Sequence, residues 1–140
     1  MGTPRHWVYG QLTTYPSLIA LIGEEDPRVF AKKSMTSAIE LHPYLVYKLG
    51  YEANEELSEE LDISRQFIQV WVHDFSDGET ADYEKIDAVI TQVKAALRRG
   101  SSAQDGVIYA KWIETSQDLN DETLNTVFKY ARFQLITKEQ

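Results

Sequence analysis

The sequence predicts an α+β fold: a mainly antiparallel β-sheet with one long helix, about residues 80–99, packed across it, and a short N-terminal helical segment. Three observations support this fold class. Ile63–Phe75 has the β-branched and aromatic content of a long strand. Residues 83–97 carry an apolar stripe at helical spacing. Two further strand-like stretches, Val107–Thr115 and Leu124–Thr137, close the chain.

Composition sets the scale of the protein and excludes several classes of function. The chain has 140 residues, 43% of them apolar, which suits a single domain over residues 1–140 with a sizeable core. Its 14 basic and 22 acidic residues give a net charge of −8, which argues against a nucleic-acid binder as a whole. The absence of cysteine excludes disulfides, thiolate catalysis and thiolate metal sites. No apolar run is long enough to span a membrane.

The N-terminal part is expected to contain short elements. Trp7–Ile22 has roughly helical spacing interrupted by Pro16, which predicts two short helices or one kinked helix ending at Gly23. A short extended piece, Arg28–Ala31, follows. Tyr44–Tyr51 is rich in Tyr, Val and Leu and predicts a strand.

The middle of the chain supplies the central strand and the long helix. Both faces of Ile63–Phe75 carry large apolar groups, so we expect this strand to be covered on two sides. The helix after it begins near Thr80 and ends at Gly100. Its apolar stripe comprises Tyr83, Ile86, Val89, Ile90, Val93 and Leu97.

The last two strands are predicted to form an antiparallel hairpin, because only a short segment with a turn at Gln117–Asp121 separates them. A sheet of this kind has open edges, and open edges invite another chain.

No catalytic or metal-binding constellation stands out. His6, His42 and His73 have no ligand spacing, so we predict no metal site. The seven glycines are scattered singly, which excludes a phosphate loop and a dinucleotide fingerprint, and no glycine-flanked serine elbow is found. We therefore expect no enzyme activity and no cofactor.

An acidic segment at residues 52–62 is the most unusual local feature, with six acids and no base: Glu52, Glu55, Glu56, Glu59, Glu60 and Asp62. Carboxylates cannot be buried unpaired without a large desolvation cost. The segment is therefore either a solvated loop that aids solubility or a surface that faces a lumen or a basic partner. A catalytic carboxylate pair is a third interpretation, but such pairs normally sit in an apolar cleft.

The order of elements resembles that of the tail-completion or tail-terminator proteins of long-tailed bacteriophages. The resemblance runs from Tyr9 to Thr137, but Pro16 and the acidic segment do not map onto it. The stretches that carry it are Leu18-Ile19-Ala20-Leu21-Ile22-Gly23, Arg28-Val29-Phe30, Pro43-Tyr44-Leu45-Val46-Tyr47-Lys48-Leu49-Gly50, Arg65-Gln66-Phe67-Ile68-Gln69-Val70-Trp71-Val72-His73, Ile86-Asp87-Ala88-Val89 and Tyr130-Ala131-Arg132-Phe133-Gln134-Leu135.

The resemblance implies a structural role in the virion, at the head-proximal end of the tail, after assembly in the host cytoplasm. Proteins of this family form a ring, typically a hexamer, that caps the tail tube, ends its polymerisation and presents a face to the head connector. DNA passes through the lumen without specific binding. The family has no catalytic residues. Its partners are other copies of the same chain, the tail tube protein and the connector.

Two other functions stay open at this stage: a head-completion or neck protein on the other side of the joint, and a small acidic enzyme or ligand-binding domain. For a ring, the exposed aromatics of the hairpin and the N-terminus are candidate subunit contacts, with completion of the core as the alternative role. These residues are Trp7, Tyr9, Tyr109, Trp112 and Tyr130.

Overall fold

The fold is that of a computed structural model, which describes residues 3–23, 29–31, 44–54, 63–75, 83–98, 100–102, 104–121 and 126–138. The elements in these ranges are α1 (Pro4–Thr14), α2 (Pro16–Ile22), β1 (Val29–Ala31), β2 (Tyr44–Asn54), β3 (Ile63–Phe75), α3 (Tyr83–Leu97), β4 (Val107–Thr115), β5 (Leu119–Asp121) and β6 (Thr126–Lys138). The predicted α+β class is confirmed, with three helices in the described part of the chain.

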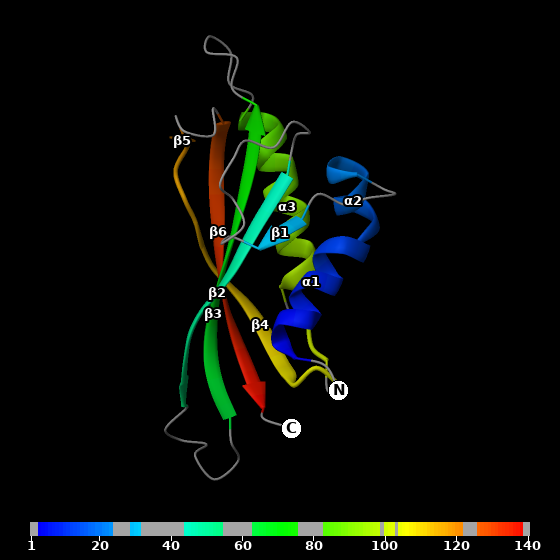
Figure 1. Ribbon diagram of the computed structural model, residues 1–140, viewed down its shortest axis with the longest axis vertical. Coiled ribbons are helices and arrows are strands. Elements are labelled where there is room, and N and C mark those ends of the chain that lie inside the picture. Colours follow the sequence, from blue (N-terminus) through cyan, green and yellow to red (C-terminus); the bar gives the residue numbers. More distant parts are fainter. Residues whose placement is uncertain are drawn as a thin grey trace.

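The strands form a six-stranded sheet with the order β1-β2-β3-β6-β4, and β5 pairs with β6 beyond the end of β4 (Figure 1). Every pairing is antiparallel except that of β1 with β2. The longest pairing joins β3 to β6, from Ile63 opposite Lys138 to Phe75 opposite Thr126, without a bulge. These two strands are therefore the centre of the sheet.

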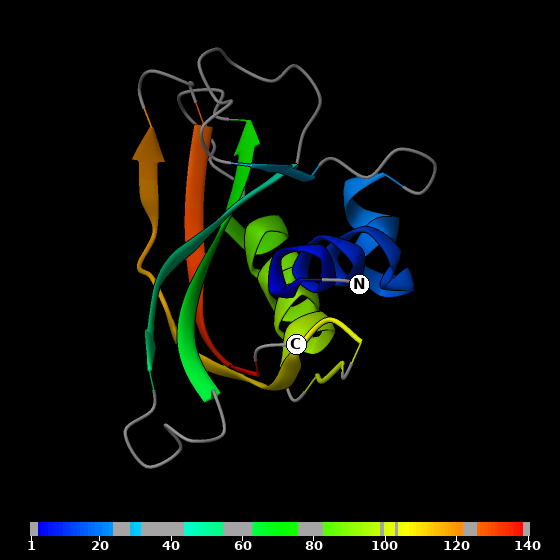
Figure 2. The same ribbon diagram turned by 60° about the horizontal axis from the view of Figure 1, so that its bottom comes forward.

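All three helices lie on one side of the sheet (Figure 2). The α3 stripe at Ile86, Val89 and Val93 is fully buried and packs with the inward-facing residues of β3 and β6. On β3 these inward residues are Ile68, Val70 and Val72, with exposed fractions of 0–1%. The core thus occupies the layer between the helices and one face of the sheet.

Two prolines explain why the N-terminal segment contains two helices. Pro4 and Pro16 each occupy the first turn of a helix, where a missing N–H is tolerated. Between the helices Tyr15 has an extended backbone, with φ −68° and ψ 113°, because the residue before a proline disfavours the helical region. The Thr3 side chain accepts a hydrogen bond from the His6 backbone N–H at 3.1 Å and caps α1.

Three local expectations differ from the structure. Residues 119–121, expected within a turn, form strand β5, because Leu119 to Asp121 pair with Phe128 to Thr126. Strand β3 is central but only one of its faces is covered by helices, as the opposite residues Phe67 and Trp71 remain half-buried. The N-terminal helical segment begins at Pro4 rather than at Trp7.

The N-terminal helix is fixed to the end of α3 by close packing at Gly100. Trp7 is 6% exposed, and a Cβ at position 100 would lie only 2.4 Å from the Trp7 ring. On the same side of the molecule, the Gln11 side-chain N–H donates to the Ala96 carbonyl oxygen at 2.9 Å. Glycine at position 100 is thus required by the tryptophan that covers it.

We predict that Val93→Asp lowers the free energy of unfolding by about 3 kcal/mol or more, since Val93 is fully buried and the new charge would have no partner there. Ala95→Asp, two residues along α3 at an exposed position, is the matched control and should cost only about 1 kcal/mol, from lower helix propensity and the helix dipole. Urea denaturation of both variants tests the placement of the helix. Equal midpoints would contradict it.

A pair of glycine variants tests the contact between α1 and Gly100. Gly100→Ala should cost about 1–3 kcal/mol through overpacking against Trp7. Gly10→Ala, in the middle of α1 with nothing within 4 Å of the added Cβ, should instead stabilise the protein by up to about 1 kcal/mol. Thermal unfolding distinguishes the two signs, and a neutral Gly100→Ala would mean that Trp7 does not pack there.

Candidate interaction surface on the sheet

The face of the sheet that points away from the helices is the most distinctive surface of the described part of the chain, and we call it the outer face. Directly opposed residues of paired strands project to the same side. The pairing places Lys48 beside Gln69, and Gln69 beside Arg132. Arg132 in turn lies opposite Glu114 on β4. These four residues form one row across the sheet.

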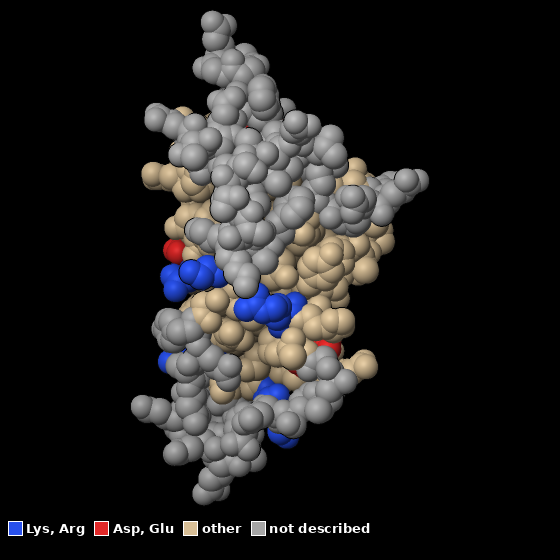
Figure 3. All heavy atoms as spheres, in the orientation of Figure 1, with Lys and Arg blue, Asp and Glu red and all other residues tan. Residues whose placement is uncertain are grey.

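The outer face is basic although the chain as a whole is acidic. Among residues with described side chains, the register assigns five cations to it, against the single acid Glu114. The cations are Lys48, Arg65, Lys111, Arg132 and Lys138. Figure 3 shows Lys and Arg atoms gathered where the strands cross in Figure 1, with few acidic atoms among the coloured residues. The net charge of −8 therefore conceals a local excess of positive charge.

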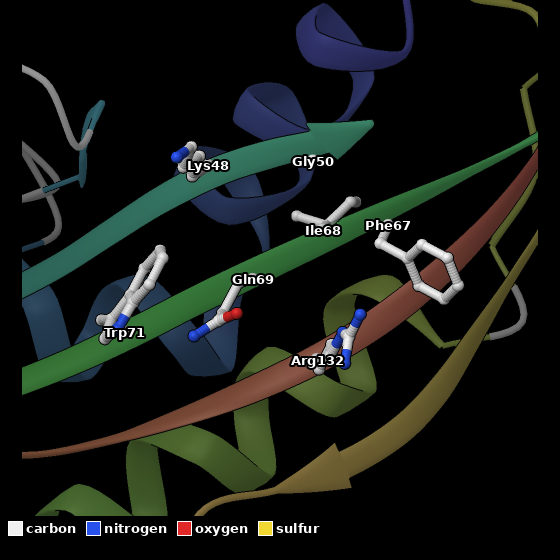
Figure 4. A pocket seen from close by; sticks show the side chains of 7 residues that line it. All are labelled: Lys48, Gly50, Phe67, Ile68, Gln69, Trp71 and Arg132. Atoms are coloured by element: carbon white, nitrogen blue, oxygen red, sulfur yellow. The ribbon is translucent and has the colours of Figure 1, made fainter. Parts of the chain in front are cut away.

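A hollow of about 230 Å³ lies at the centre of this face, lined by Lys48, Gly50, Phe67, Ile68, Gln69, Trp71 and Arg132. Figure 4 shows the Lys48, Trp71 and Arg132 side chains projecting from three neighbouring strands around it. The Arg132 guanidinium lies 4.8 Å from the centroid of the Phe67 ring, a cation–π arrangement. Its contact with the Glu114 carboxylate is long, at 3.8 Å.

Stacked rings make one end of the outer face rigid. The Tyr44 and His73 rings stack at 5.0 Å, and His73 stacks on Phe128 at 4.9 Å. The next row pairs Trp71 with Tyr130 at 6.4 Å. The Trp71 wall of the hollow is therefore continuous with this group of rings.

A second candidate surface lies at the β4 edge of the sheet. Ile108, Tyr109 and Ile113 are 44%, 42% and 37% exposed, and all three belong to this strand. The β4 pairing with β6 shifts register close to these positions, between Val107 and Tyr109 and between Trp112 and Glu114. Such irregularities turn apolar side chains outward and are frequent at sheet edges. We call this strip the β4 edge patch.

The structure separates the five aromatic residues suggested as subunit contacts. Tyr9 and Tyr109 are exposed, with fractions of 46% and 42%. Trp7 belongs to the core, which corrects its assignment to a surface contact. Trp112 is half-buried beneath Lys94, whose Nζ lies 3.8 Å from the ring centroid, and its indole N–H donates to the Thr115 Oγ1 at 3.0 Å. Tyr130 is half-buried on the outer face.

The acidic segment is placed only at its beginning. Glu52 belongs to strand β2, whereas Glu55, Glu56, Glu59, Glu60 and Asp62 lie outside the described residues. Within the described ranges, no group of three or more His, Asp or Glu side chains could hold a metal ion. None of the helices described is long and apolar enough to cross a membrane.

The outer-face residues Lys48, Phe67, Gln69 and Arg132 were not singled out from the sequence. Their signal is the alternation of side chains along each strand, which places every second residue on one face. That alternation becomes informative only when the register between strands is known, since it decides which residues of different strands meet.

An ion-pair cluster on the helix side ties α3 to the sheet. Lys129 Nζ lies 2.6 Å from an Asp87 carboxylate oxygen and 3.2 Å from one of Asp118. The hydrogen bond to Asp87 is the main cause that raises the pKa of Lys129 above its usual 10.5. Nearby, the Tyr83 hydroxyl donates to the Leu119 carbonyl oxygen at 2.9 Å, and burial raises the pKa of this phenol.

We expect Asp87→Asn to cost about 0.5–1 kcal/mol at neutral pH, since Asp87 is 55% exposed and solvent weakens the pair. The pKa of Lys129 is higher in the folded protein than its value of 10.5 in the unfolded chain, so the ion pair stabilises the fold fully at a pH below 10.5. This contribution to stability is lost as the pH rises through the pKa of the folded state. The difference between wild type and variant should therefore shrink above pH 10.5. Thermal unfolding against pH measures it, with Glu114→Gln, at an exposed pair, as the control. A difference constant to high pH would contradict the assignment.

Fold and surface together define a two-layer α+β domain, with helices on one side of the sheet and two exposed surfaces, one basic and one apolar, on the sheet. No protein-family model matches the sequence, and neither does any curated protein sequence. Among solved structures, the fold is similar to a chain of the "Virion of native gene transfer agent (GTA) particle". The TM-score is 0.68 at 18% identity, over 94% of this chain and 92% of that one. At this identity the likeness establishes a shared fold.

Proposed function

We propose that this protein is a structural subunit of a phage-like virion and forms a ring, a hexamer, that caps the tail tube. In this role the ring ends tube polymerisation and offers the attachment face for the head connector. The protein acts without catalysis and without a cofactor, and DNA passes through the ring. Its place is the head-proximal end of the tail.

The single observation that carries this proposal is the likeness of nearly the whole fold to a chain of a gene transfer agent virion. The match covers 94% of this chain and 92% of that one. The order of elements along the sequence, which resembles that of tail terminators, supports the same class independently. An assembled particle needs subunits that bind one another, and the exposed β4 edge patch suits that need.

A closed ring requires two different surfaces on each subunit, because each copy meets one neighbour with one patch and the next with another. The β4 edge patch is one such surface, since an edge strand with exposed apolar side chains gains by being covered. Tyr9, on α1 and away from β4, belongs to a separate exposed site.

We predict that the double variant Ile108→Lys/Ile113→Lys remains folded and monomeric, because both side chains are already solvent-exposed and the added charges oppose burial in an interface. Gln117→Lys/Asn120→Lys, at exposed polar positions nearby, is the matched control and should assemble normally. Sedimentation velocity gives the assembly state, and electron microscopy with purified tail tubes gives the position of the ring.

Wild-type rings at one end of each tube, with tube elongation stopped, are the expected result. If the protein binds isolated connectors but never tubes, its function is that of a neck protein and not of a tail terminator. A protein that stays monomeric at high concentration and on tubes would overturn the ring altogether.

A further inference from the structure

We propose that the basic outer face binds the acidic segment, residues 55–62, of a neighbouring copy of this chain. The inference rests on the proposed ring function and names one of the two contacts that the ring needs. The site is the hollow between Lys48, Trp71 and Arg132, and its occupant is a run of glutamate carboxylates.

Charge favours this pairing. Each copy carries −8, so copies repel one another at separations within a Debye length of about 8 Å in physiological salt. Assembly in spite of this repulsion favours an interface in which opposite local charges meet. Among residues with described side chains, the outer face holds five cations and one acid, whereas residues 52–62 hold six acids without a base.

The hollow has the chemistry that a carboxylate needs. Lys48 is exposed at one rim and Arg132 lies at the other, while Phe67 and Trp71 supply apolar walls that reduce competition from water. A guanidinium binds a carboxylate best through two short hydrogen bonds of about 2.7–2.9 Å. The 3.8 Å contact between Arg132 and Glu114 is longer than this, so a second carboxylate can form the better pair.

The proposed ring assigns the occupant to another copy. Each subunit of a closed ring meets its neighbours through two different surfaces, so the outer face of one copy needs an unlike surface of the next. The acidic segment of the neighbour is unlike the outer face in charge.

Nucleic acid is the other polyanion that a basic face could bind. The chain's excess of acids opposes it, since the body around the basic face repels phosphate. At one end of the outer face, the Tyr44, His73 and Phe128 rings are also stacked on one another rather than presented for stacking with bases. A glutamate-rich segment matches the surface better.

A cross-linking experiment identifies the occupant directly. Equal amounts of ¹⁵N-labelled and unlabelled full-length protein are assembled together and treated with a carbodiimide, which joins amines to carboxylates without a spacer. The expected product joins Lys48 of one copy to a residue of the segment 55–62 of another, seen as peptides of mixed isotope composition. The proposal would be overturned if all Lys48 cross-links joined two peptides with the same isotope label. It would also be overturned if Lys48 were cross-linked only to segments other than residues 55–62.

A charge exchange tests the energetics. Two charge-reversed variants are compared: Lys48→Glu/Arg132→Glu on the outer face, and Glu55→Lys/Glu56→Lys/Glu59→Lys/Glu60→Lys in the acidic segment. Each variant should raise the protein concentration needed for assembly at least about tenfold. Mixing the two variants should restore assembly, because each reversed patch meets its reversed partner. Arg5→Glu/Arg98→Glu, at exposed positions on α1 and just after α3, matches the first variant in charge change and should assemble like wild type. Circular dichroism verifies that each variant is folded. If the glutamates of the first variant disturb the sheet, Lys48→Gln/Arg132→Gln replaces it in the assembly measurement.

The outcomes separate this inference from the ring function. Normal rings from both charge-reversed variants would overturn the inference and leave the ring intact. No assembly of wild type on tubes or at high concentration would overturn both. Fluorescence anisotropy with a labelled DNA oligonucleotide tests nucleic acid as the alternative partner. If wild type binds DNA and Lys48→Glu/Arg132→Glu abolishes this binding without changing assembly, the outer face binds nucleic acid instead.

Discussion

The pairing of β3 with β6 is the constraint on which the rest of the structure depends. Thirteen residues of each strand pair in one uninterrupted register. Because side chains alternate along a strand, this register decides at once which residues enter the core and which form the outer face. A slip of β6 by one position would bring Arg132 under the helices and expose Ala131. The buried inward faces of both strands make such a slip costly.

The helices use only one side of this sheet, and that asymmetry creates the interaction surface. Sheets with one face packed and one face solvated normally alternate apolar and polar residues. Here the solvated side holds large aromatics beside lysine and arginine, which is more apolar than water contact alone would favour. In the proposed ring, a neighbouring copy covers this surface.

Local chemistry along the chain was largely predictable. The proline positions, the stripe of α3 and the strand content of residues 63–75 predicted the class of fold and most of its elements, because propensity and periodicity are properties of short segments. Strand β5 was missed because three polar-flanked residues carry no periodicity, and they become a strand only through pairing with Phe128 to Thr126. The sequence left open whether Trp7 is a surface contact or part of the core, since its burial depends on Gly100, 93 residues away.

The sequence by itself determined the α+β class, the excess of acids and their concentration at residues 52–62, since these follow from composition and local pattern. The tertiary structure alone decided that the scattered Lys48, Phe67 and Arg132 meet around one hollow. It also decided that Tyr109 is exposed while Trp7 is buried. The reason is that cross-strand neighbours are chosen by long-range register, which no short stretch of sequence encodes.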